Sequence, residues 1–302
     1  MSNFILSAES TIDMPYSYAR ERDINILFYT YMVDDIEYVD DMGRDPKALP
    51  AFYDMLAAGK LPITSQINVF RYQEYFEELL NKYEGDILHI TLGSGMTSSI
   101  NNAITAADLL EEKYPNRKIK VLDSICSSAG YGLLVDEVYE MKKDGKSIDE
   151  ISDWVIKNRK NIHHQFFTID LKFFQRSGRV RGAAAKVGNI LNICPIMRLD
   201  NDGKIIAYDK VRGKKNAIKT TVKAMEKHAV GGLSYAGKCF VCHSNCVDEA
   251  KEIAAAIQKK FTMLKGRVQV FDIGTIIASH CGPGTVAIFF FGDERLPDRV
   301  KA

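Results

Sequence analysis

The sequence lacks the features that would place it in a membrane or on nucleic acid. No run of apolar residues approaches the roughly 20 needed to cross a bilayer, and Val286–Phe291 has only the length of a strand. The formal net charge is +1, too balanced to favour nucleic acid by bulk electrostatics. Met1–Leu6 lacks the basic segment that opens a signal peptide. We therefore expect a cytoplasmic protein without a nucleic-acid partner.

Motifs for nucleotide, metal or covalent acyl chemistry are also missing. The sequence has no G-x-x-x-x-G-K-[ST] loop to hold phosphates. The G-x-S-x-G pattern of a nucleophilic serine fails at Ser94, because Leu92 stands where the first glycine should be. The acidic residues show no spacing typical of metal ligands. We therefore expect no metal, no cofactor and no catalytic residue, and a chain that is not an enzyme by itself.

Cysteine is scarce, with six residues, but four residues that can bind metal gather in one short segment: Cys239, Cys242, His243 and Cys246. The spacing C-x-x-C-H occurs in covalent haem attachment and could also supply zinc ligands. Haem attachment normally requires export, however, and no second C-x-x-C lies nearby. The favoured interpretation is a buried strand within Tyr235–His243. Alternation along such a strand would place Cys239 and Val241 on one face, and Phe240 and Cys242 on the other.

The chain instead contains short apolar runs that alternate with helical patterns, which is typical of an α/β fold. We expect two domains. Residues 1–163 would form an α/β/α domain with a parallel sheet, and residues 164–302 a second α/β domain with a mixed sheet. A hairpin signal at Asp202-Gly203 supports the mixed sheet.

The expected strands are 4–6, 24–33, 86–92, 118–122, 166–169, 196–199, 204–209, 239–243, 268–272 and 286–291. The expected helices are 98–113, a segment through Met141 that ends at Gly145, 148–159, 214–227 and 248–261.

Small hydroxyl-bearing loops stand at the predicted ends of three strands in the first half, at residues 7–11, 91–99 and 123–128. Ligands bind outside the carboxyl ends of strands in open parallel sheets, and a following helix N-terminus favours an anion. Helix capping alone would explain any one of these loops. Three loops at one edge indicate an anion pocket, with capping as the open alternative.

Two further polar segments precede or follow regular elements. Leu61–Gln66 is a polar loop before a helix, and Ser279–Gly284 contains a histidine beside a Gly-Pro-Gly turn. A lone histidine is usually structural, but His280 on a glycine-rich loop is a better functional candidate.

Taken together, six segments resemble the DegV family, the fatty-acid-binding subunits of bacterial fatty acid kinase, in order and over the full length. Glu9–Asp13 resembles D-S-T-x-D, and Thr64-Ser65-Gln66 matches T-S-Q. Ile90–Ala103 resembles S-S-G-L-S-G-T-Y-Q-S-A, and Leu122–Gly130 resembles I-D-S…S-A-G. Phe174–Val180 resembles L-x-K/R-G-G-R-I, and His280–Gly284 resembles H-x-G-P-G. The departures from the pattern include Glu9 in place of Asp, Met96-Thr97-Ser98-Ser99 in place of L-S-G-T, which loses the glycine at Ser98, and Ile100 in place of an aromatic residue.

The resemblance implies a fatty acid of about C14 to C18 in a tunnel between two domains, with the second domain enclosing the acyl chain. Its carboxylate would be bound by Thr64, Ser94 with Gly95, and His280. Secondary candidates for the same pocket are Ser10, Ser65, Ser127 and Ser128.

The resemblance also implies a partner, a separate ATP-dependent kinase that converts the bound carboxylate to an acyl phosphate. Arg176 and Arg179 would face this kinase, whereas a solvated cationic loop explains Lys186. Transient membrane contact would allow lipid exchange. The alternatives are a serine-dependent acyl hydrolase or transferase using Ser94 and His280, or a small-molecule carrier unrelated to a kinase.

Overall fold

The first sheet is made of four parallel strands, built from apolar runs buried on both faces. The computed structural model describes residues 4–181 and 192–297. The strands of this sheet, in spatial order, are β2 (Asn25–Leu27), β1 (Phe4–Glu9), β6 (Asp86–Thr91) and β7 (Ile119–Asp123). All neighbouring pairs run parallel, so the carboxyl ends of β1, β6 and β7 lie at one edge, as the sequence predicts.

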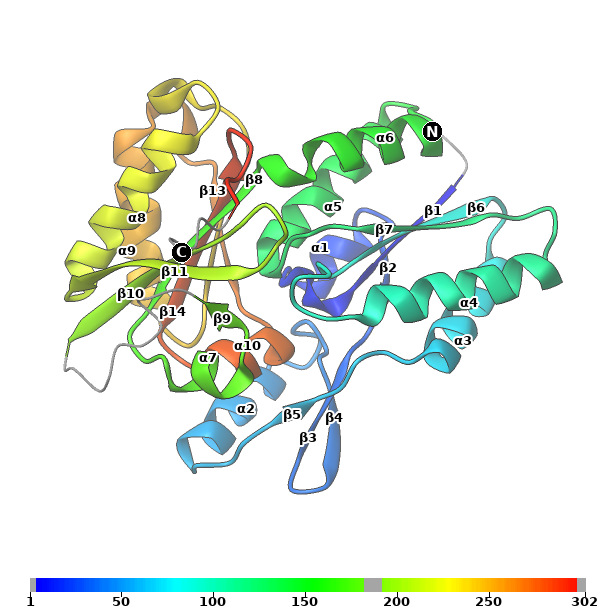
Figure 1. Cartoon of the computed structure of the whole chain (residues 1–302), viewed down its shortest axis with the longest axis horizontal. Helices are drawn as coiled ribbons and strands as arrows, with labels where there is room; N and C mark the ends of the chain where they lie inside the picture. Colours follow the sequence, from blue (N-terminus) through cyan, green and yellow to red (C-terminus); the bar gives the residue numbers. More distant parts are fainter. Residues whose placement is uncertain (1–3, 182–191, 298–302) are drawn as a thin grey trace.

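Helices cover both faces of this sheet (Figure 1). On one side lie α3 (Val69–Lys82) and α4 (Ser99–Lys113), and on the other α5 (Ser128–Lys143) and α6 (Ile148–Asn158). A short helix, α1 (Tyr16–Arg20), precedes β2. The start of α6 is fixed by a capping box, in which Ser147 and Glu150 bond each other's backbone N–H groups.

The prediction of one strand over residues 24–33 is wrong, because this segment forms two strands in different sheets. β2 ends at Leu27 beside β1, and β3 (Thr30–Val33) enters a small antiparallel sheet. That sheet has the order β4 (Ile36–Val39), β3, β5 (Ile63–Thr64), and α2 (Ala48–Ala57) lies between β4 and β5 in the sequence. Both strands are rich in apolar residues, so hydrophobicity alone does not reveal that the chain changes sheets at Phe28-Tyr29.

The second sheet has seven strands and is mixed, as predicted. Its order is β13 (Val268–Asp272), β12 (Cys239–His243), β14 (Thr285–Phe291), β8 (Ile162–Thr168), β10 (Ile193–Leu199), β11 (Ile205–Arg212) and β9 (Val180–Arg181). β10 and β11 form the antiparallel hairpin expected around Asp202-Gly203. β8 begins four residues before the expected strand, so its first two residues precede the expected domain boundary at 163/164.

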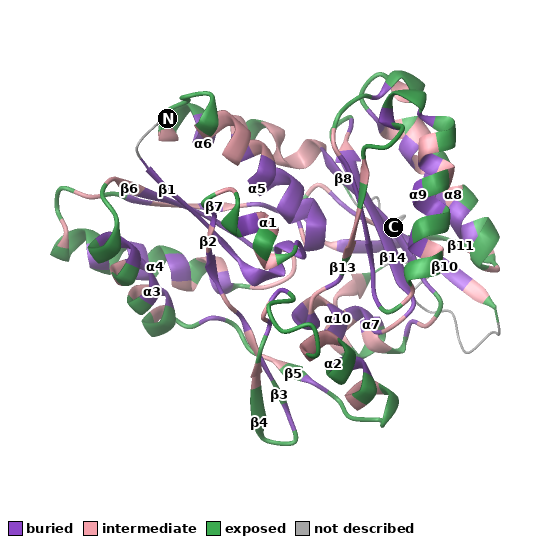
Figure 2. Ribbon diagram, turned by 180° about the vertical axis from the view of Figure 1, so that it is seen from behind, coloured by how far each residue is buried: buried purple, intermediate pink, exposed green. Residues whose placement is uncertain are grey.

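Helices from both halves of the chain pack on this second sheet. α8 (Lys214–His228) and α9 (Val247–Lys260) contact β8, β10, β12 and β13, while α5 of the first half contacts β8, β12 and β14. Figure 2 shows the strands buried between these layers and the outer surfaces of α8 and α9 exposed.

The residues of β12 alternate between the two sides of the second sheet. Cys239 and Val241 belong to the core beneath α8 and α9, and Phe240 and Cys242 to the core shared with α5. This confirms the predicted facing of the strand cysteines. The thiol of Cys242 points to the carbonyl of Asp13 and that of Cys246 to Thr285, so the two do not converge.

Two short elements complete the region of interest. α7 (Lys172–Ser177) and β9 occupy the start of the basic segment singled out in the sequence, and the rest of that segment, Lys186 included, lies outside the described residues. α10 (Thr275–Cys281) connects β13 to β14. Within the described ranges, no helix is long and apolar enough to cross a membrane.

Candidate functional site

His280 lies in the last turn of helix α10, and the expectation that it sits on a glycine-rich loop is wrong. The glycines come directly after it: Gly282 has φ 67° and ends the helix in the left-handed region. The segment from Thr275 to Cys281 is only two turns long and contains adjacent isoleucines, which have low helix propensity. A helix so short depends on its surroundings, and its sequence gives little sign of it.

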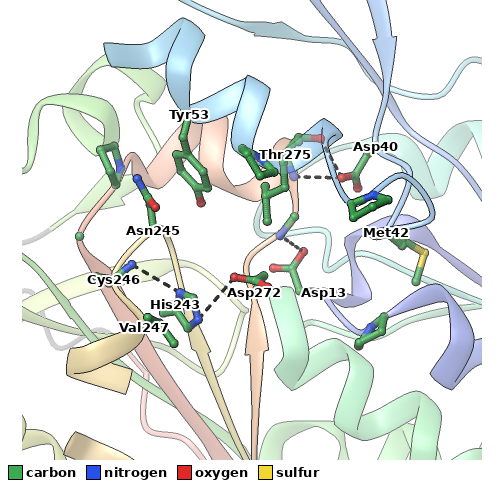
Figure 3. A pocket seen from close by; sticks show the side chains of 18 of the residues that line it. Asp13, Asp40, Met42, Tyr53, His243, Asn245, Cys246, Val247, Asp272 and Thr275 are labelled. Atoms are coloured by element: carbon green, nitrogen blue, oxygen red, sulfur yellow. Dashed lines mark hydrogen bonds and ion pairs between the residues drawn. The ribbon is translucent and has the colours of Figure 1, made fainter. Parts of the chain in front are cut away.

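Two buried carboxylates hold the first turn of α10 (Figure 3). Asp13 accepts a hydrogen bond from the backbone N–H of Gly274 at 3.0 Å and another from the hydroxyl of Ser128. Asp40 accepts from both the backbone N–H and the hydroxyl of Thr275, at 2.9 and 2.8 Å. These donors are N-terminal groups of a helix, which favour negative charge. The two aspartates therefore fix where α10 begins and, five residues after Thr275, where His280 points.

The same two carboxyl groups are strongly desolvated. Burial raises the pKa of Asp13 well above its ordinary value, and the nearby charges of Asp40 and Asp272 raise it further. Burial also raises the pKa of Asp40, against the lowering effect of its hydrogen bonds. Keeping these buried groups charged is unfavourable, so burying them where they fix α10 lowers the free energy of unfolding at high pH.

A third buried carboxylate, that of Glu9, holds the loop after β6. It accepts a hydrogen bond from the backbone N–H of Leu92 at 2.7 Å and one from the hydroxyl of Tyr72. The glutamate is fully buried at the end of β1, directly beside β6. The longer side chain at this position of the motif thus reaches across to the neighbouring strand end.

The glycines of the 93–95 loop allow close approach to protein backbone. A Cβ at Gly93 would lie 2.7 Å from the backbone of Cys126, and one at Gly95 would lie 2.4 Å from the carbonyl oxygen of Gly203. Gly203 belongs to the turn between β10 and β11, so Gly95 lets the loop after β6 touch a turn of the second sheet. The backbone N–H of Ser94 donates to Asp123 at 3.0 Å.

These loops and α10 enclose a cavity of about 290 Å³, here called the head-group cavity. Across it the hydroxyl of Thr64 and Nε2 of His280 lie 2.8 Å apart. The polar lining is Thr64, Ser65, Gln66, Ser94, Thr97, Ser98, Ser127, Arg179 and His280, and the apolar lining includes Leu92, Met96, Phe174, Ile205, Ile276 and Ile277. Burial lowers the pKa of His280 to about 4, and the positive charges of Arg179 and Arg176 contribute. The imidazole is therefore neutral at pH 7, in a positive environment suited to an anion.

Of the residues selected from the sequence, seven line this cavity: Thr64, Ser65, Ser94, Gly95, Ser127, Arg179 and His280. Ser10 and Ser128 do not. Ser10 accepts a hydrogen bond from the backbone N–H of Tyr29, and Ser128 donates to Asp13. Arg176 is exposed on α7 and donates to the carbonyl of Ser279 in α10 at 3.0 Å.

A second and larger cavity, of about 1040 Å³, lies beside the first turn of α10 (Figure 3). Acidic side chains dominate its lining: Asp13, Asp40, Asp41, Asp45, Asp170, Asp248, Glu249 and Asp272. Lys214 and His243 are the basic residues among its described lining. A carboxylate ligand would be repelled here, so size does not decide between the cavities and charge favours the head-group cavity.

The sequence predicted many of the residues that line the cavity, but it did not predict the residues that hold the lining segments in place. Asp40 and Tyr72 act through contacts with segments distant in the chain, for which the sequence carries no local signal. Arg179 was selected for a different role, and its place in the cavity wall depends on how β9 pairs with β11.

The chain belongs to the DegV family. A family model described as an uncharacterised protein of the DegV family matches residues 5–293. A DegV domain-containing protein of Clostridium perfringens is 36% identical over 299 residues, covering 98% of this chain and 100% of that protein. The DegV domain-containing protein YteA of Lactococcus lactis is 30% identical over 295 residues, 95% of this chain and 96% of its own.

Solved structures have the same fold. A structure described as a DegV lipid-binding protein from Thermotoga maritima matches with a TM-score of 0.82 at 24% identity, covering 98% of this chain and 100% of that one. DegV of Bacillus subtilis, described as a fatty acid binding protein, matches with a TM-score of 0.79 at 24% identity, covering 97% and 100%. The expected two-part α/β architecture with one parallel and one mixed sheet is confirmed.

Replacing Asp13 with asparagine should change how stability depends on pH. The native state of the parent binds a proton at Asp13 more tightly than the unfolded state, so this group makes stability fall as pH rises from about 4 through its raised native pKa. Asparagine keeps the acceptor for Gly274 without the charge. Urea denaturation should show Asp13→Asn to be more stable relative to the parent at pH 8 than at pH 5.

The matched control for this measurement is Asp153→Asn, which removes an exposed carboxylate of α6. Its stability relative to the parent should be nearly the same at both pH values. A stability difference for Asp13→Asn that is independent of pH, or that grows less favourable at pH 8, would contradict the account of this buried carboxyl group.

Proposed function

We propose that this protein binds a long-chain fatty acid, with the carboxylate in the head-group cavity at Thr64, Ser94 with Gly95, and His280. One observation carries the proposal. A single cavity contains hydroxyl groups, an imidazole and a guanidinium above an apolar wall, and this combination suits an amphiphile with one negative charge.

The physical chemistry of the cavity supports a carboxylate in particular. A buried carboxylate must be hydrogen-bonded or paired to offset the loss of water. Thr64 and His280 are already held 2.8 Å apart, and one carboxylate oxygen could accept from both. Arg179, half-buried at the rim, supplies the compensating positive charge. We assign Arg179 to the ligand in addition to the kinase-facing role expected from the sequence.

The apolar side of the cavity supports an alkyl chain. Phe174, Ile205 and Ile276 belong to α7, β11 and α10 and line it from the second half of the molecule. Each buried CH₂ contributes about 0.8 kcal/mol, so a chain of about C14 to C18 would supply most of the binding energy while the polar groups set its orientation.

Structural relatives bind ligands of this class. A protein of Thermotoga maritima is described as revealing fatty acid binding function, and a DegV family protein of Streptococcus agalactiae as fatty acid binding. Other relatives are described with vaccenic acid in Ruminococcus gnavus, heptadecanoic acid in Eubacterium eligens and stearic acid in Eubacterium ventriosum. These ligands share a long chain and one carboxyl group.

Ser94→Ala, Thr64→Val and His280→Gln should each weaken retention of the fatty acid. A hydrogen bond to a charged group contributes about 1.5–3 kcal/mol, which corresponds to roughly a tenfold or greater loss of affinity. Displacement of a fluorescent fatty acid measures this directly.

The control is Ser17→Ala, an exposed hydroxyl in α1 away from the cavity, which should bind like the parent. Parent-like affinity in all three cavity variants would exclude the proposed carboxylate site. Ester hydrolysis that disappears in Ser94→Ala would point to the serine hydrolase instead. In the described part of the chain, His280 Nε2 pairs with Thr64 and no hydrogen bond joins it to Ser94, so the geometry does not favour that alternative.

We further propose that the bound carboxylate is presented to a separate ATP-dependent kinase, which forms the acyl phosphate. The sequence has no phosphate-binding loop of its own, and an exposed cation, Arg176 of α7, contacts the turn of α10 that carries His280. An arginine at this place can bind a partner's acidic side chain or steady a nucleotide phosphate.

Arg176→Ala should leave fatty acid bound but slow its phosphorylation by a cognate kinase by about tenfold or more, as expected when a charged hydrogen bond is lost. Lys172→Ala is the matched control, because it removes another exposed cation from the same helix. Normal phosphorylation by Arg176→Ala, or an equal loss in Lys172→Ala, would show that Arg176 has no specific role at the kinase interface.

A further inference from the structure

Three metal-ligand side chains from distant parts of the chain meet at the end of the second sheet away from α10. They are His163 in β8, His228 at the end of α8, and Asp293 after β14. Nε2 of His163 and Nδ1 of His228 lie 2.9 and 3.0 Å from the same carboxylate oxygen, Oδ1 of Asp293. Among the described residues, these three side chains bring their ligand atoms within 4.8 Å of one another.

The cluster is held by backbone contacts that do not depend on its own side chains. The backbone N–H of Asp293 donates to the carbonyl of His228 at 3.0 Å, and that of Gly292 donates to Asn161 at 2.8 Å. A Cβ at Gly292 would lie 2.3 Å from the His228 carbonyl oxygen and 2.7 Å from the ring of His163. Glycine at this position therefore allows three chain segments to converge.

The arrangement exceeds what an ion pair needs. One imidazole suffices for one carboxylate, but here two rings stack with centroids 4.9 Å apart and direct their nitrogens at one oxygen. The carbonyl oxygen of Asp293 adds a fourth polar atom, 2.9 Å from Nε2 of His163.

We infer that His163, His228 and Asp293 form a binding site for a first-row divalent cation of the zinc type. Two imidazoles with one carboxylate suit zinc and its neighbours, whereas magnesium and calcium prefer oxygen ligands. Ligands 2.0–2.1 Å from a tetrahedral zinc ion lie about 3.3 Å apart, so the two nitrogen–oxygen separations of 2.9 and 3.0 Å need to widen only slightly.

The site would be separate from the head-group cavity. β8 runs from His163 at the cluster to Thr168 near α7, and Thr168 pairs with Thr285, five residues after His280. Five residues of strand span about 17 Å, so the cation would not touch the fatty acid. The exposed carboxylate of Asp293 leaves a coordination position open to water.

The cation would instead fasten the chain after β14. Two residues beyond Asp293, the buried guanidinium of Arg295 donates to the carbonyls of Ile125 and Arg159 in the first half of the molecule. Tying Asp293 to β8 and α8 would hold Arg295 in that place. A ligand that binds only the native state also raises the unfolding temperature.

The test uses full-length protein without an affinity tag, freed of metal by chelator and titrated with Zn²⁺ by calorimetry and with Co²⁺ by visible absorption. We expect one ion per chain, a tetrahedral Co²⁺ spectrum, and a rise of a few degrees in the unfolding midpoint. His228→Gln and Asp293→Asn should each weaken Zn²⁺ binding about 100-fold while fatty acid binding stays unchanged.

The matched control is His243→Gln. His243 and Asp272 form a similar histidine–aspartate pair, 3.4 Å apart, but in the described part of the chain this pair has no third ligand within reach. The variant should bind Zn²⁺ like the parent. Absence of one-to-one binding in the parent, or an equal loss in His243→Gln, would overturn the inference. If His228→Gln unfolds, Asp293→Asn, whose side chain is exposed, decides the outcome.

Discussion

Two buried aspartates at the first turn of a seven-residue helix determine where the imidazole of His280 lies. Asp13 and Asp40 bind the backbone N–H groups of Gly274 and Thr275, and the helix then carries His280 to within hydrogen-bonding distance of Thr64. So short a helix would not persist by itself in water. The carboxylates replace the missing intrahelical partners, and the donors that they receive offset only part of their desolvation.

The motif Glu9–Asp13 positions two segments that line the head-group cavity without lining the cavity itself. Glu9 fixes Leu92 at the end of β6, just before Ser94, while Asp13 fixes α10. A motif at the end of the first strand thus sets the distance between the two halves of the head-group cavity without lining that cavity. The contact of Gly95 with Gly203 adds a direct packing constraint between the halves.

Much of this arrangement follows from the sequence, because it depends on local patterns. The ends of β1, β6 and β7 form one sheet edge, the β10–β11 hairpin turns at Asp202-Gly203, and the residues of β12 alternate between two cores, all as periodicity and turn chemistry predict. Thr64, Ser94 and His280 come together at the place that their motifs suggest. Their role as carboxylate ligands stays a prediction.

What the sequence could not predict depends on contacts between distant segments. The division of residues 24–33 between two sheets, the helix at His280, the acidic lining of the larger cavity and the His163–His228–Asp293 cluster have no local signature. In the last case the partners lie 65 and 130 residues apart. Spacing rules detect ligands that share a helix or a turn, and they miss ligands that a sheet edge brings together.

The central claim is that the head-group cavity holds the carboxylate of a long-chain fatty acid. Native mass spectrometry of the protein, purified without added lipid, tests it most directly. We predict that a large share of the molecules carry one fatty acid of about C14 to C18, which is released and identified on denaturation. Protein that carries no lipid, or carries a polar metabolite instead, would contradict the account.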